Sequence, residues 1–60
     1  MEQVESKRGK ATITQSNSFW IVTLTSKRTG DIFMLTSTDE RRAHNKYFQF
    51  KAWVQKEEEQ

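Results

Sequence analysis

The distribution of apolar residues predicts β-strands in the first two thirds of the chain and a helix after them. Residues 10–15 alternate between apolar and polar side chains, which predicts a short edge strand. Residues 19–25 are rich in β-branched and aromatic side chains and predict the clearest strand. Residues 31–36 predict its antiparallel partner, across a turn in which Gly30 suits a left-handed position.

The register of this hairpin stays open by one residue. A four-residue turn at 27–30 places Phe33 and Leu35 beside the most apolar face of the preceding strand, whereas a three-residue turn with a bulge places Ile32 and Met34 there. Both registers leave apolar residues on both faces of the sheet. One face can take a helix, and the other needs a dimer partner, the N-terminal strand or a ligand as its cover.

A helix is predicted after the strands because a start signal precedes a run with helical spacing. Residues 37–40 have the sequence of a capping box, in which Ser37 caps the amide of Glu40 and Glu40 reaches back. Phe48 lies off the apolar stripe, and the alternation over 46–54 also fits a strand, so an all-β chain with a strand there is the alternative. The apolar stripe at helical spacing comprises Ala43, Tyr47, Phe50 and Val54.

These elements predict an α+β fold, with a small antiparallel sheet of two or three strands packed against one C-terminal helix near residues 38–56. We expect residues 1–9 to form a flexible basic and polar arm, residues 10–56 to form the single domain, and residues 57–60 to form an acidic frayed tail. The helix stripe is expected to pack on Trp20, Val22 and Leu24.

Length and composition limit how such a fold can be stabilised. A 60-residue chain buries only about 60% of its unfolded surface, so its stability is marginal. The chain has no Cys and one His, which excludes disulfides and gives no expected metal site, and homodimerisation is a remaining option. No apolar run is long enough for a signal peptide or a membrane span, so we expect a cytoplasmic protein with no membrane contact.

The formal net charge of +2 conceals an uneven distribution. All ten Lys and Arg residues lie within 7–56, together with only three of the eight acidic residues, so that this segment has a formal charge of +7. A basic body with acidic ends favours nucleic acid as the partner, or an acidic protein.

Catalysis is not expected, because the chain lacks a convincing set of reactive groups. His44 follows Glu40 by one helical turn, and a surface contact explains both residues. Asp39 and Glu40 would diverge by about 100° on a helix, so they do not form a carboxylate pair. Two Gly residues are too few for a glycine-rich phosphate loop, and no cofactor is predicted.

Non-catalytic binding of nucleic acid, in a regulatory or DNA-transaction role, is the leading hypothesis. Clustered Lys and Arg residues neutralise phosphates and release counterions. The candidate phosphate-binding residues are Lys7, Arg8, Lys10, Lys27, Arg28, Arg41, Arg42 and Lys46. Small size and a basic body also fit viral or mobile-element accessory proteins.

The aromatic residues provide a second hypothesis. Phe19 and Phe48 are the better candidates for exposed rings that stack on unpaired bases, whereas Trp20, Phe50 and Trp53 are expected in the core. The alternative function is a module that binds and blocks, or adapts, an acidic protein. Its contact residues would be Phe19, Phe48 and Trp53, with Arg41 and Arg42 beside Phe48 and Trp53 in one patch.

One short echo occurs in the sequence. Ser6-Lys7-Arg8-Gly9 resembles Ser26-Lys27-Arg28-Thr29-Gly30. We interpret the first as part of the arm and the second as a hairpin tip, and their similarity as chance.

Overall fold

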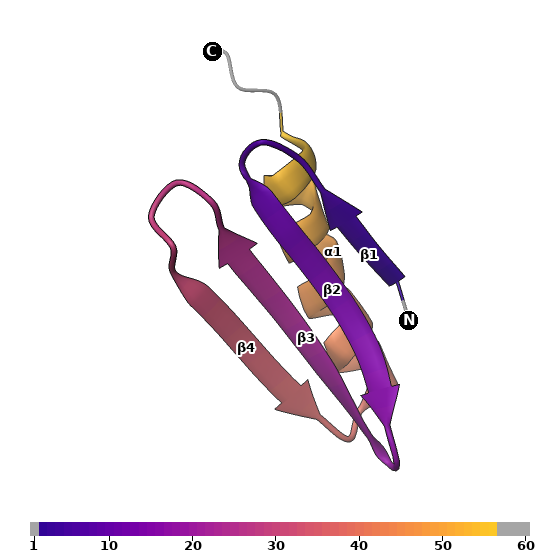
Figure 1. Ribbon diagram of the computed structural model, residues 1–60. Helices are drawn as coiled ribbons and strands as arrows, with labels where there is room; N and C mark the ends of the chain where they lie inside the picture. The colour runs from indigo at the N-terminus through magenta and orange to yellow at the C-terminus, as the bar shows by residue number, and fades with distance from the viewer. Residues whose placement is uncertain (1, 57–60) are drawn as a thin grey trace.

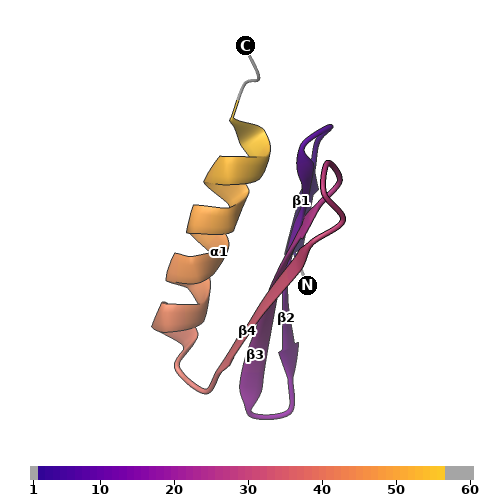
Figure 2. The same cartoon turned by 90° about the vertical axis from the view of Figure 1, so that its left-hand side faces the viewer.

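The computed structural model of the protein describes residues 2–56, and the predicted acidic tail at 57–60 lies outside them. Its elements are β1 (Glu2–Glu5), β2 (Gly9–Ser16), β3 (Phe19–Ser26), β4 (Ile32–Ser37) and α1 (Glu40–Gln55). The four strands form one antiparallel sheet in the order β1-β2-β3-β4, and α1 lies across one face of it (Figures 1 and 2). The predicted α+β class is confirmed, with four strands in place of two or three.

The additional strand is β1, which occupies part of the segment expected to be an arm. Glu2–Glu5 pair with β2, with Val4 opposite Ala11. Val4 is half-buried and packs against the core, while the three other β1 residues are exposed. A strand with one inward apolar side chain is held mainly by backbone hydrogen bonds, so its sequence pattern is weak.

The β3–β4 hairpin adopts the register of the four-residue turn. Leu24 lies opposite Phe33, and Val22 lies opposite Leu35. Gly30 has φ of 82°, the left-handed region that favours glycine, and its N–H donates to the carbonyl of Ser26 over 2.8 Å.

The helix extends continuously through 46–54, so the all-β alternative is wrong. Its N-cap is Asp39, and the predicted capping box does not form. The Asp39 carboxylate accepts hydrogen bonds from the backbone amides of Arg41 (3.0 Å) and Arg42 (3.4 Å). Ser37 lies too early to cap and accepts instead from the Asp39 amide over 3.0 Å.

The core lies between α1 and the two central strands. Ala43, Tyr47 and Val54 of the predicted stripe are buried, whereas Phe50 is half-buried at the side. The buried residues from the sheet are Ala11, Ile13, Val22 and Leu24. Trp20 packs against this cluster but is only half-buried, because it lies near the end of the sheet.

The sheet face away from α1 is rich in threonine and has no helix over it. Because side chains alternate, the neighbours of the buried residues in β2 and β3, such as Thr12 and Thr23, point to this open face. These two threonines are hydrogen-bonded to each other across the strands. Among the described residues, no helix is both long and apolar enough to span a membrane.

Candidate functional site

Two basic turns lie side by side at one end of the sheet. The β1–β2 connection carries Lys7 and Arg8, and the β3–β4 connection carries Lys27 and Arg28. An antiparallel meander places its first and third turns at the same end (Figure 1). The backbone N–H of Lys27 donates to the carbonyl of Arg8 over 3.0 Å, which joins the turns. We call the four side chains Lys7, Arg8, Lys27 and Arg28 the basic end.

This arrangement gives the sequence echo a structural meaning that the sequence alone does not reveal. The first Ser-Lys-Arg motif begins directly after β1 and the second begins at the last residue of β3, and both lie at the same end of the sheet. The sequence pattern assigns the first copy to an arm because it does not predict β1. Once β1 is present, both motifs are hairpin turns, and the repetition itself is the signal that could have indicated the site.

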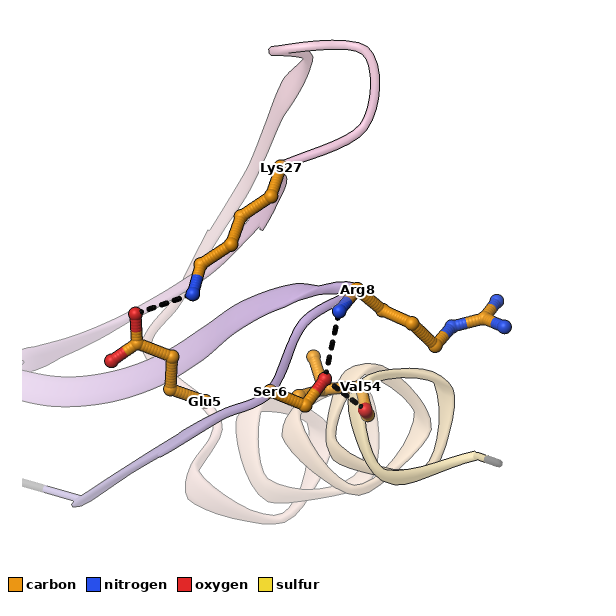
Figure 3. Close-up of polar contacts among 5 residues, drawn as sticks. All are labelled: Glu5, Ser6, Arg8, Lys27 and Val54. Carbon is orange, nitrogen blue, oxygen red and sulfur yellow. Dashed lines mark hydrogen bonds and ion pairs between the residues drawn. The ribbon is translucent and has the colours of Figure 1, made fainter. Parts of the chain in front are cut away.

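Ser6 fixes the first turn against the end of α1. Its hydroxyl donates to the backbone carbonyl of Val54 over 2.6 Å and accepts from the amide of Arg8 over 3.0 Å (Figure 3). The carbonyls of the last helical turn lack partners within the helix, so Ser6 satisfies one of them. One hydroxyl therefore couples the position of Arg8 to the helix.

The Arg8 side chain is held on the indole of Trp53. Its guanidinium carbon lies 4.3 Å from the centre of the ring, which is cation–π geometry. Arg8 Nε is buried and has no hydrogen-bond partner among the described residues. Gly9 permits this approach, because a Cβ there would lie 3.2 Å from the Trp53 ring and 2.1 Å from the carbonyl oxygen of Thr25.

The basic end and Trp53 together line a surface pocket of about 330 Å³. Lys27 is partly neutralised there, because its Nζ lies 2.7 Å from a carboxylate oxygen of Glu5 (Figure 3). This hydrogen bond, with the charge of Lys27, holds the pKa of Glu5 below its ordinary value of 4.5. Across residues 2–56 it is the one ion pair within 4.0 Å, so Lys7, Arg8 and Arg28 have no carboxylate partner in that part of the chain.

Lys10 also belongs to this half of the molecule. It lies on the open face, between Glu5 of β1 and Thr25 of β3. Its charge adds a smaller contribution to the lowered pKa of Glu5. Of the residues predicted to bind phosphate, Lys10 is thus the one that extends the basic end onto the sheet.

The three basic residues of the helix form a separate group. Arg41, Arg42 and Lys46 line a shallow hollow of about 320 Å³ at the start of α1, together with Asp39, Asn45 and Gln49. Val54, which contacts the first basic turn, lies at the other end of α1. At a rise of 1.5 Å per residue, about 20 Å of helix separates Arg41 from Val54, and about 12 Å separates Lys46 from Val54. The structure therefore does not bring all the predicted phosphate-binding residues together.

The three predicted contact aromatics are also dispersed. Trp53 lies at the basic end, and Phe48 is exposed on the outer side of α1. Phe19 is half-buried and lines a different hollow, beside Thr36 and Ser37. Arg41 and Arg42 lie about three helical turns from Trp53, so Trp53 does not join them in the expected aromatic and arginine patch.

His44 contacts its own helix and β3. Its Nδ1 lies 3.0 Å from the backbone carbonyl of Glu40, and its ring lies at 65° to the ring of Trp20 with centroids 5.0 Å apart. Within residues 2–56, no three His, Cys, Asp or Glu side chains are grouped to hold a metal ion.

In comparisons with known proteins, the chain matched no family model, no curated protein and no solved structure.

Proposed function

We propose that the protein binds nucleic acid without catalysis, through phosphates held at the basic end, in a regulatory or DNA-transaction role. The observation that carries this proposal is the hydrogen bond from Lys27 to Arg8, which places two basic turns in one surface. A single basic turn is an ordinary solvated loop, whereas two joined turns concentrate positive charge at one place.

The state of the individual cations supports phosphate binding. Lys7 and Arg28 are available, since neither has a carboxylate within 4.0 Å in the described chain. Arg8 is already ordered by Trp53, so it loses little conformational freedom when its remaining N–H groups meet a phosphate oxygen. Lys27 can exchange its exposed Glu5 partner for a phosphate at small cost, because surface ion pairs contribute little.

The arrangement favours contacts to the backbone of the nucleic acid over contacts to its bases. One face of the Trp53 ring is covered by Arg8, and the open sheet face carries mainly threonines, with Phe19 as its one aromatic residue within the four strands. Phosphate contacts position a protein but carry no sequence information. We therefore expect binding with little sequence preference.

An acidic protein partner is the alternative. That hypothesis relied on a patch of aromatic and arginine side chains, and the structure places Trp53 apart from Arg41 and Arg42. The grouping that remains is basic, and this is why nucleic acid is preferred.

The test is fluorescence anisotropy of a labelled oligonucleotide, single-stranded or duplex, titrated with protein at several salt concentrations. Four phosphate contacts give a slope of log K against log salt of about −3.6 for duplex and about −2.8 for a single strand. Absence of binding at low salt with both oligonucleotides would overturn the proposal.

A matched pair of double variants locates the site. Lys7→Gln with Arg28→Gln removes two charges from the basic end, and Arg41→Gln with Arg42→Gln removes two from the helix. The first pair should reduce the magnitude of the slope of log K against log salt by about 2, and the second by less than about 1. Equal effects would mean that net charge alone attracts the oligonucleotide, which contradicts a site at the basic end.

A further inference from the structure

The β4 edge of the sheet exposes an unusual amount of apolar surface. Ile32, Phe33 and Met34 are 68%, 52% and 65% exposed. They follow one another in the strand, so they project alternately to the open face and to the helix face. The whole of β4, Ile32–Ser37, contains no charged residue and no proline.

The backbone of this edge is also unpaired on its outer side, because β4 is the last strand of the sheet. The amide of Ser26 donates to the carbonyl of Asp31, so these two residues occupy a hydrogen-bonded position of the β3–β4 ladder. Hydrogen-bonded and non-bonded pairs alternate along an antiparallel ladder. The N–H and C=O groups of Ile32, Met34 and Thr36 therefore point away from β3.

These outward groups identify the kind of partner that fits the edge. A row of alternating backbone donors and acceptors is satisfied by another extended strand. The uncharged apolar side chains of β4 need a neighbouring strand that is also uncharged and apolar. A second copy of β4 has both properties. If Met34 lies opposite Met34 of the second copy, Ile32 lies opposite Thr36 and Phe33 opposite Leu35, and every outward residue is paired.

The opposite edge of the sheet is built differently. Glu2 and Glu5 are exposed on β1, and charged side chains on an edge strand oppose pairing with another sheet. An assembly that uses β4 twice leaves only β1 edges at its ends. It therefore stops at two copies.

We propose that the protein forms a two-fold symmetric homodimer through antiparallel pairing of β4 with β4, centred on Met34, which gives one eight-stranded sheet. The β4 strands run in opposite directions, so the two basic ends lie at opposite ends of this sheet. Pairing of this kind does not depend on nucleic acid and is tested without it.

The first experiment is sedimentation equilibrium of the full chain over a range of concentrations. The mass should rise to twice the 7.1 kDa of the chain. Met34→Lys places two like charges opposite each other at the dyad and should keep the protein monomeric. Phe48→Lys is the matched control, since it changes an apolar residue of similar exposure on α1 and should leave the dimer intact. A monomer at all concentrations, or a dimer that survives Met34→Lys, would overturn the proposal.

Cysteine cross-linking tests the register without relying on a disruptive variant. The chain has no native Cys, so Met34→Cys introduces a single thiol. Opposite residues of a hydrogen-bonded pair have Cα atoms about 5.5 Å apart, within the range of a disulfide. Ile32→Cys would place its two thiol-bearing residues about 13 Å apart, at about 3.3 Å per residue. Rapid oxidation to a covalent dimer is expected for Met34→Cys only, and equal oxidation of Ile32→Cys would contradict the pairing.

Discussion

Gly9→Ala should strongly destabilise the fold, because the added methyl group meets backbone and not a movable side chain. A Cβ at Gly9 would lie 2.1 Å from the carbonyl oxygen of Thr25 and 3.2 Å from the Trp53 ring. Cβ atoms essentially never lie within 3.0 Å of such an atom, so β2 and β3 must separate locally by about 1 Å.

The size of the effect can be compared with the stability of the whole domain. Overpacking typically costs about 1–3 kcal/mol, and a contact with a paired strand belongs at the upper end. A 60-residue domain has a free energy of unfolding of about 3–9 kcal/mol, at about 0.05–0.15 kcal/mol per residue. A loss of about 3 kcal/mol would remove a third of this stability or all of it.

Urea denaturation followed by tryptophan fluorescence and circular dichroism measures this loss, and Gly30→Ala is its control. Gly30 has φ of 82°, and a Cβ added there would have nothing within 4 Å, so its variant costs only backbone strain of about 1–2 kcal/mol. Both variants reduce the entropy of the unfolded chain equally, so their difference compares the steric contact at Gly9 with the backbone strain at Gly30. If Gly9→Ala were as stable as Gly30→Ala, the close approach of β2, β3 and Trp53 would be wrong.

Three further predictions concern the helix. Asp39→Ala should lower the free energy of unfolding by about 1 kcal/mol, because it removes the N-cap, and an unchanged urea midpoint would show that the cap contributes nothing. Val54→Ala should lower it by about 2 kcal/mol through lost burial and a small cavity, and a loss below about 0.5 kcal/mol would contradict full burial. Burial raises the pKa of the Tyr47 hydroxyl above its ordinary value of 10.0, so the unfolded chain releases this proton first. Stability should therefore decline as the pH rises above 10, and urea titrations of Tyr47→Phe at the same pH values should show a smaller decline.

The sequence predicts the elements whose patterns are long, and fails where few side chains determine the structure. β3 and α1 are predictable because each buries several residues at a regular spacing. The register of β4 is ambiguous in the sequence because its apolar run fits either face, and the turn geometry at Gly30 decides it. β1 escapes prediction because only Val4 packs inward.

The site is predictable in composition but not in arrangement. All members of the basic end are candidates from the sequence, yet so are Arg41 and Arg42, which lie at the other end of α1. Only the tertiary structure separates the two groups. Trp53 is expected in the core, and its contact with Arg8 depends on the β1–β2 turn that the sequence does not predict, so no local pattern indicates it.

The most direct test of binding at the basic end is an NMR titration of ¹⁵N-labelled protein with a short oligonucleotide at low and moderate salt. The amides of Lys7, Arg8, Lys27 and Arg28 should shift together with the indole N–H of Trp53, and the shifts should diminish as salt increases. Shifts confined to Arg41 and Arg42, or no shifts at low salt, would contradict a nucleic-acid site at the two joined turns.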